Sequence, residues 1–147
     1  MKSNSNMKTA IATPDAPPAL GPYSQGVKVG DSIYVSGQLP INSKSGEIVS
    51  GGIAAQTEQV LLNIREILEE AESSLKDVVK ITIFLKDLSN FAEVNRVYEL
   101  FFPNSEFAPI VPPARSTVEV SRLPRDAEIE MDAIAILSGG YIDPEFY

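Results

Sequence analysis

The spacing of apolar residues switches between a strand-like period of two and a helix-like period, and this switching most constrains the fold. From Ile53 to Glu72 the apolar residues form one helical stripe, made of Val60, Leu61, Ile64, Ile67, Leu68 and Ala71. From Val78 to Asp87 they alternate, with Val79, Ile81, Ile83 and Leu85 set against Lys80, Thr82 and Lys86. The first segment therefore predicts an amphipathic helix, and the second predicts a strand buried on one face.

The remaining segments repeat these two patterns and complete the expected order of elements. We expect a short edge strand over 8–12, a hairpin of strands 26–29 and 32–36, and strands over 114–123 and 128–137. A second helix should begin after the capping residue Asn90 and bury the stripe Phe91, Val94, Tyr98 and Phe101. We expect loops over 40–52 and 104–113. The order β-β-β-α-β-α-β-β predicts an α+β fold, a mixed sheet with both helices packed on one face. Because the sequence offers no third helix, we expect self-association to cover the other face.

A chain of 147 residues predicts a single domain, which we place at residues 7–137. The polar segment 1–6 is expected to be disordered, and 138–147 to be a C-terminal extension. No run approaches the roughly 18 apolar residues of a membrane span, and the first twelve residues lack the apolar core of a signal peptide. We therefore expect no membrane contact and a cytoplasmic location, which the absence of cysteine fits.

The charge and the missing residue types exclude several classes of function. With 12 basic and 20 acidic residues the net charge is −8, and the basic residues are scattered, so nucleic-acid binding is disfavoured. Without His or Cys there is no Ser-His-Asp triad, cysteine nucleophile, histidine zinc site or two-histidine ribonuclease. No phosphate-binding glycine motif occurs, and we expect neither a metal nor a cofactor. Acid–base chemistry by Glu, Asp or Tyr remains, with Arg to hold an anion.

Arg115 is the strongest candidate for such an anion holder. It lies at the start of an otherwise apolar strand, in Pro113-Ala114-Arg115-Ser116-Thr117-Val118. A guanidinium makes two parallel, charge-assisted hydrogen bonds to a carboxylate. Strand alternation puts Thr117 and Glu119 on the same face as Arg115, which makes that face unusually polar. The plainer alternative, an arginine that extends from a strand end into solvent, stays open.

Two further polar residues are candidates for the same site. If the last two strands pair around the turn at Pro124, Glu130 lies near the level of the segment 115–119 and could act as a base. Its alternative is an acidic residue on a solvated edge. Asn95 lies on the apolar stripe of the second helix, where an amide needs hydrogen-bond partners. It either contacts a ligand or fixes a loop, and the second role is favoured.

An ordered set of short segments resembles a known family. The matching segments are Gly21-Pro22-Tyr23-Ser24-Gln25, Val35-Ser36-Gly37-Gln38, Gln56-Thr57 with Asn63, Asp77-Val78-Val79-Lys80, Asn95-Arg96-Val97-Tyr98, Pro113-Ala114-Arg115-Ser116 and Ile129-Glu130. Over about 7–136 they resemble the reactive intermediate deaminase (Rid, or YjgF) family, long catalogued as endoribonuclease L-PSP. Within it the chain is most similar to the imine-deaminase A subgroup, which carries arginine at the position of Arg115 and glutamate at that of Glu130.

The resemblance implies a chorismate-mutase-like fold and a homotrimer with clefts between subunits. It implies hydrolysis of 2-imino acids, formed from enamines, to 2-keto acids and ammonia, with Arg115 holding the carboxylate and Glu130 activating water. The substrate-binding positions that it implies are Tyr23, Ser36, Gly37, Asn95, Arg115 and Thr117. The expected ligand is thus a small 2-imino or 2-keto acid.

Two departures from the family keep alternatives open. Many members have Cys at the position of Thr117, and the loop between Phe102 and Arg115 is longer here. The alternatives are a non-catalytic trimer that binds small carboxylates, and an endoribonuclease or translation inhibitor as the older family name suggests. The negative charge and the absent histidines count against the last of these.

Overall fold

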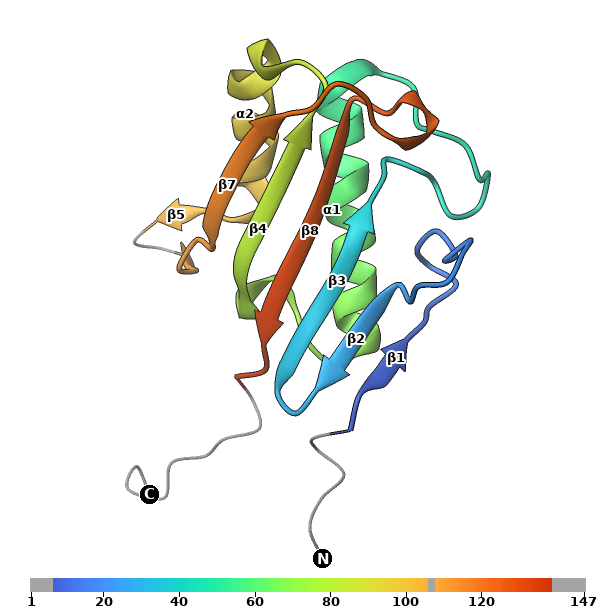
Figure 1. The fold of residues 1–147 in the computed structure, drawn as a ribbon. Coiled ribbons are helices and arrows are strands. Elements are labelled where there is room, and N and C mark those ends of the chain that lie inside the picture. Colours follow the sequence, from blue (N-terminus) through green and yellow to red (C-terminus); the bar gives the residue numbers. More distant parts are fainter. Residues whose placement is uncertain (1–6, 106–107, 139–147) are drawn as a thin grey trace, which may run out of the picture.

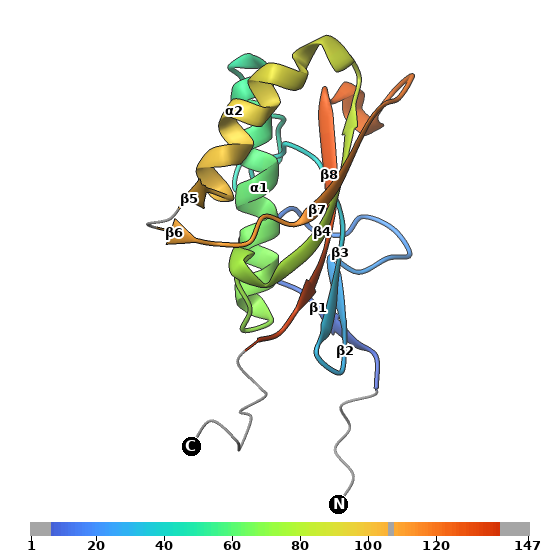
Figure 2. The same ribbon diagram turned by 90° about the vertical axis from the view of Figure 1, so that its left-hand side faces the viewer.

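The structure is a computed structural model that describes residues 7–105 and 108–138. The expected disordered segment 1–6 and positions 139–147 of the expected extension lie outside the described residues. Figure 1 shows a sheet in front of two α-helices. Its strands are β1 (Thr9–Ile11), β2 (Gly26–Val29), β3 (Ser32–Gln38), β4 (Val78–Leu85), β7 (Ala114–Glu119) and β8 (Ile129–Ile136), and the helices are α1 (Gly52–Glu70) and α2 (Phe91–Phe101). The predicted α+β fold with both helices on one face is confirmed (Figure 2).

The core lies between α1 and the sheet. The predicted stripe of α1 is buried, and it packs against the inward residues Ile33, Ile81, Ile83, Leu85, Ile129 and Met131, all of which are fully buried. In β8, and in β4 from Ile81 onward, every second residue is buried, which is the pattern expected when only one face of a sheet is covered. At the start of β4 a register shift buries Val78 and leaves Val79 44% exposed, contrary to the predicted alternation. No helix in the part of the chain that the structure describes is long and apolar enough to cross a membrane.

The strand order is β1-β2-β3-β8-β4-β7, which corrects one prediction. The last two strands of the chain do not pair with each other, because β4 lies between them. β4 pairs with β7 in parallel and with β8 in antiparallel fashion, and Phe84 lies opposite both Val118 and Glu130. β7 is thus an edge strand, and Glu130 is two strands away from it, roughly 9–10 Å across the sheet.

Four further local predictions differ from the structure. The segment 104–113, expected to be a loop, contains the short paired strands β5 (Asn104–Ser105) and β6 (Ala108–Pro109). The strand expected over 114–123 ends at Glu119. Asn90 precedes α2 but makes no capping hydrogen bond, and the Asp87 carboxylate instead accepts one from the Ser89 amide at the start of the 3-10 turn Leu88–Asn90. The stripe of α2 is only partly buried, since Phe91 is 40% exposed.

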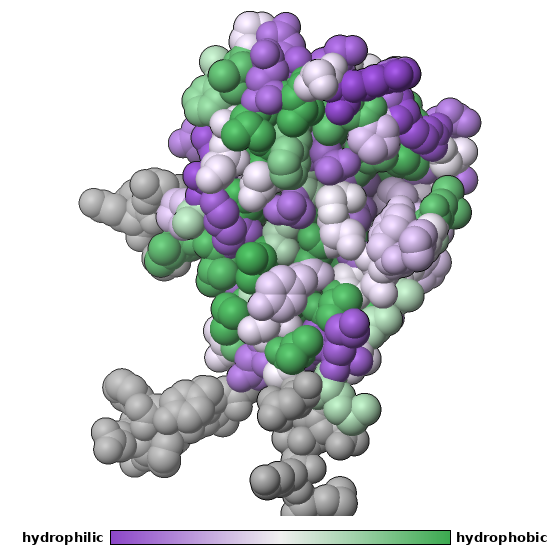
Figure 3. All heavy atoms as spheres, in the orientation of Figure 1, coloured by the Kyte–Doolittle hydropathy of each residue, from purple (hydrophilic) through white to green (hydrophobic). Residues whose placement is uncertain are grey.

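The face of the sheet away from the helices is open. Large apolar residues on it remain exposed, including Tyr34 at 49%, Val118 at 43% and Ile136 at 41%. Figure 3 views this face and shows hydrophobic residues mixed with hydrophilic ones. Exposed apolar area of this kind marks a surface that another chain can cover.

Candidate active site

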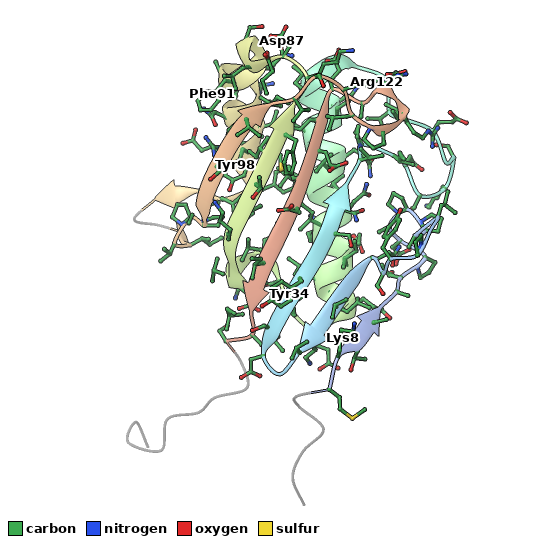
Figure 4. All side chains as sticks on the ribbon, in the orientation of Figure 1. Lys8, Tyr34, Asp87, Phe91, Tyr98 and Arg122 are labelled. Atoms are coloured by element: carbon green, nitrogen blue, oxygen red, sulfur yellow. The ribbon has the colours of Figure 1, made fainter. Side chains whose placement is uncertain are left out.

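Arg115 lies on the helix side of the edge strand β7 and is half-buried. It pairs in register with Ile81, whose side chain is buried against the helices. Its guanidinium carbon lies 4.8 Å from the centre of the Tyr98 ring and 5.4 Å from that of Phe91. Figure 4 labels both aromatic residues, which come from α2. Arg115 therefore packs against two aromatic rings as a cation–π contact.

The other four arginines of the chain have carboxylate partners. They form ion pairs with Glu66 and Glu69 (Arg65), Glu93 (Arg96), Asp126 (Arg122) and Glu47 (Arg125), at N–O distances between 2.6 and 4.0 Å. Among residues 7–105 and 108–138, no carboxylate lies within 4.0 Å of the Arg115 guanidinium. Within this described part of the chain, Arg115 is therefore the arginine best suited to receive a carboxylate from outside.

Asn95 and Thr117 belong to the same region as Arg115. Asn95 is half-buried and lies one helical turn from both Phe91 and Tyr98. Thr117 follows Arg115 by two residues and so shares its face of β7. The Val120 amide donates to the Leu85 carbonyl on β4. Successive amides of a strand point to opposite sides, so the amides of the odd-numbered residues Arg115 and Thr117 point away from β4, toward the free edge of the sheet. These residues form what we term the arginine half-site: Phe91, Asn95, Tyr98, Arg115 and Thr117.

Glu130 lies in a second region, where β3 contains an irregularity. The register between β3 and β8 shifts between Val35 and Gln38, which adds one residue to β3 at Ser36-Gly37. Such bulges redirect side chains and occur often next to active sites. A Cβ atom at Gly37 would lie 2.6 Å from Oε2 of Glu130 and 2.9 Å from its Cδ. Only glycine at this position leaves the Glu130 carboxylate its present place.

The surroundings of Glu130 favour a proton acceptor. Burial raises the pKa of the Glu130 carboxyl above its ordinary value, and the negative charge of Asp132 raises it further. Asp132 itself has a raised pKa because of burial. A carboxylate with a raised pKa takes a proton from water more readily than an ordinary one does. Glu130 is thus suited to act as a general base.

Ser36 belongs to the bulge, and Tyr23 lies beside it. The Ser36 hydroxyl donates to the Ser24 carbonyl at 2.5 Å, so its proton is already used and it can only accept from a ligand. Tyr23 is 56% exposed, and together with Gly37 it lines a hollow of about 350 Å³. The apolar walls of the hollow are Pro17, Pro18, Leu20, Leu39, Ile41 and Pro124. We term Tyr23, Ser36, Gly37 and Glu130 the glutamate half-site.

The two half-sites lie on opposite faces of the sheet. Glu130 pairs with Phe84 on the open face, whereas Arg115 pairs with Ile81 on the helix face. One small ligand therefore cannot touch Arg115 and Glu130 of the same chain. Glu130 is level with Val118, within the expected segment 115–119, but both of these side chains face away from the side of the sheet that carries Arg115.

Several matched polar residues hold the loops around the glutamate half-site. The side-chain nitrogen of Gln25 donates to the backbone carbonyls of Thr13, Ala16 and Pro17. The side-chain oxygen of Gln56 accepts from the backbone amide of Glu128. Asn63, which is 1% exposed, donates to the carbonyls of Leu39 and Ile41. For Asn63 the sequence signal was a polar residue within the apolar stripe of α1.

We expect Asn63→Leu to lower the free energy of unfolding by about 2–4 kcal/mol, because two part-buried carbonyls each lose a donor and that of Leu39 keeps, among the described residues, only the Ile41 amide. Gln59→Ala is the control, since it removes only the donor to the Asn63 side-chain oxygen and is expected to cost less than about 1.5 kcal/mol. Urea denaturation of the three proteins measures both values. Equal stability of Asn63→Leu and the wild type would contradict this role.

Comparison with protein families gives one match, to endoribonuclease L-PSP over residues 13–137. A curated relative, 2-iminobutanoate/2-iminopropanoate deaminase from Escherichia coli K12, is 51% identical over 132 residues, which cover 88% of this chain and 98% of that protein. A RutC family protein of Pyrococcus abyssi is 55% identical over 128 residues, which cover 87% and 96%.

Solved structures show the same fold. A putative endoribonuclease from Thermotoga maritima superposes with a TM-score of 0.83 at 48% identity, covering 90% of this chain and all of that one. TdcF of E. coli with bound serine superposes with a TM-score of 0.82 at 40% identity, covering 88% and 99%. The likeness therefore extends over nearly the whole described part of this chain.

Proposed function

Because this chain belongs to the endoribonuclease L-PSP family, we propose that it hydrolyses 2-imino acids to 2-keto acids and ammonia. The observation that carries the proposal is the state of Arg115, which lies against two rings and has no carboxylate partner among the residues described. The name of the E. coli relative, 2-iminobutanoate/2-iminopropanoate deaminase, supports the same chemistry.

The reaction needs a held carboxylate, a placed water and a proton acceptor. Arg115 binds the substrate carboxylate through the two N–H groups of its fork. The Glu130 carboxylate takes a proton from water as the water oxygen bonds to the carbon of the protonated C=N group, and a neutral tetrahedral carbinolamine forms. Glu130 then returns that proton to the nitrogen. The C–N bond breaks as the C=O bond forms, and the hydroxyl proton passes to Glu130 and on to the leaving ammonia. Positioned acid–base catalysis of this kind contributes about 10²–10⁴-fold.

The site is proposed to form between two chains. Because the half-sites face opposite ways within one chain, a substrate that touches both must take Arg115 from one subunit and Glu130 from another. The open apolar face of the sheet supports such an assembly. We propose a homotrimer with three such clefts, as the resemblance implies. Sedimentation should then give three times the 15.9 kDa of one chain, and a monomeric mass at micromolar concentration would contradict it.

The hollow beside Gly37 suggests which imino acids are accepted. Its apolar walls favour an aliphatic side chain, and the one arginine that lines it, Arg125, is already bonded to the Gly46 carbonyl and Glu47. Small aliphatic 2-imino acids are therefore the proposed substrates. The expected cytoplasmic location stays a prediction.

The activity is tested by coupling an amino-acid dehydratase, which releases an enamine, to detection of the 2-keto acid. The protein should speed keto-acid formation well above the rate in buffer, and more for aliphatic than for acidic side chains. Binding of 2-keto acids with no acceleration would favour the non-catalytic alternative. RNA cleavage that copurifies with the protein and is lost in Arg115→Ala would favour the endoribonuclease alternative.

We expect Gly37→Ala to lower the rate of imine hydrolysis by about 10–100-fold, because the new Cβ displaces the Glu130 carboxylate. The displaced atoms are the end of a flexible side chain, so the free energy of unfolding should change by less than about 1 kcal/mol. In a Glu130→Ala background the same substitution should change the rate no further. Wild-type kinetics of Gly37→Ala would show that the position of this carboxylate is unimportant.

A further inference from the structure

The two aromatic rings beside Arg115 have no part in the reaction as proposed. We infer that Phe91 and Tyr98 are positioning residues that hold the Arg115 guanidinium with its N–H edge free for the substrate carboxylate. This inference rests on the proposed function. It concerns the residues that prepare the carboxylate holder, not the holder itself. We refer to Phe91 and Tyr98 together as the aromatic support.

The argument starts from the geometry of a guanidinium. Its flat face attracts aromatic rings, whereas its N–H groups point outward in its own plane. A carboxylate partner within the chain would occupy that N–H edge and compete with the substrate. The ring centres at 4.8 and 5.4 Å can hold the charged group without using its donors. The aromatic support thus limits the motion of a long side chain and leaves its fork without a carboxylate partner among residues 7–105 and 108–138.

The aromatic support is itself fixed in place. The Glu119 carboxylate, at the end of β7, accepts from the Leu88 amide just before α2. This bond ties the turn that leads into α2 to the strand that carries Arg115. Tyr98 is 7% exposed and packs against Phe102, with ring centres 4.8 Å apart. The distance between the rings and β7 is therefore set by contacts other than those with Arg115.

Tyr98 acts through its ring rather than its hydroxyl. The hydroxyl is buried and has no hydrogen-bond partner in the described structure. Burial raises the pKa of Tyr98 to about 12, against the opposing effect of the Arg115 charge, so the phenol stays protonated near neutral pH. Tyr98→Phe should then keep the support intact, whereas Tyr98→Leu should remove half of it.

The test compares Phe91→Leu, Phe91→Tyr, Tyr98→Phe and Tyr98→Leu, using the KM and kcat of imine hydrolysis and the Kd of 2-oxobutanoate from calorimetry. We expect Phe91→Leu to raise KM and Kd by about 2–5-fold and Tyr98→Leu by up to about 30-fold, the range for exposed and desolvated cation–π contacts. The kcat should change little, since the carboxylate is held before and during the reaction. The aromatic variants should stay within about two-fold of the wild type.

Phe91 is 40% exposed, so Phe91→Leu should fold even if the more buried Tyr98→Leu does not. In an Arg115→Ala background Phe91→Leu should have no further effect on Kd. Unchanged KM and Kd in Phe91→Leu, beside a large rise in Arg115→Ala, would overturn the inference and leave the proposed function standing. A rise in Tyr98→Phe equal to that in Tyr98→Leu would overturn the role of the ring. Wild-type kinetics in Arg115→Ala would instead overturn the proposed function.

Discussion

Replacing Arg115 with alanine should lower kcat/KM for imine hydrolysis by about 10²–10³-fold, since a charged, two-bond contact to the substrate carboxylate is lost. Most of the loss should appear in KM. Arg115→Lys should recover only part of the activity, because an ammonium keeps the charge but cannot make the paired bonds of the planar fork. The measurement is the dehydratase-coupled assay at several substrate concentrations.

The matched control is Arg96→Ala. Arg96 is exposed and its nitrogen lies 2.6 Å from a Glu93 oxygen in the same helix, so its loss should leave kcat/KM unchanged. Arg115→Ala should still fold, because its contacts are two ring faces at the edge of the sheet. If both variants had wild-type kcat/KM, Arg115 would have no part in substrate binding.

Replacing Glu130 with glutamine should lower kcat by about 10²–10⁴-fold, the usual contribution of a positioned base. In the wild type the rate should rise with pH as the Glu130 carboxyl, whose pKa is raised by burial and by Asp132, loses its proton. This limb of the pH profile should be absent in Glu130→Gln. If the residual rate of Glu130→Gln still rose with pH as that of the wild type does, the base would be another group.

The same substitution should stabilise the protein near neutral pH. Because the folded-state pKa of Glu130 is raised above its ordinary 4.5, the folded protein binds this proton more tightly than the unfolded chain does. Its contribution to stability is therefore lost as pH rises from about 4.5 through the raised pKa. Glu130→Gln should unfold at a higher temperature than the wild type above that range, and the difference should shrink below it. Thermal unfolding at several pH values measures this difference.

The sequence was a good guide to the elements and to the placing of both helices on one face, and a poor guide to the order of the strands. The helical stripe over 53–72 predicted α1, and the two-residue alternation over 78–87 predicted β4. Both patterns work because residues on the buried side of a helix or a strand recur at the period of that element. Alternation also grouped Arg115, Thr117 and Glu119 on one face of β7, as the structure has them. These patterns depend only on residues that are close together in the sequence, so they can be recognised without knowing the fold.

The relation between Arg115 and Glu130 depends on pairings far apart in sequence. Nothing local indicates that β4 lies between β7 and β8, and this pairing decides which faces the two residues occupy. The contact between Gly37 and Glu130 depends on a bulge within β3, and the strand predicted over 32–36 ended before Gly37. The support of Arg115 by Phe91 was missed because Phe91 reads as an ordinary core residue of the α2 stripe.

Mixing two inactive variants tests most directly whether the reaction site is shared between chains. Arg115→Ala and Glu130→Gln subunits, unfolded and refolded together in equal amounts, should regain about a quarter of the wild-type activity. In a randomly mixed ring, about half of the sites receive an intact arginine, and about half of these receive an intact glutamate from the neighbouring subunit. Mass spectrometry under native conditions would verify that mixed oligomers form. Mixed oligomers with no more activity than the two parents would show that no site takes its arginine from one subunit and its acid from the next.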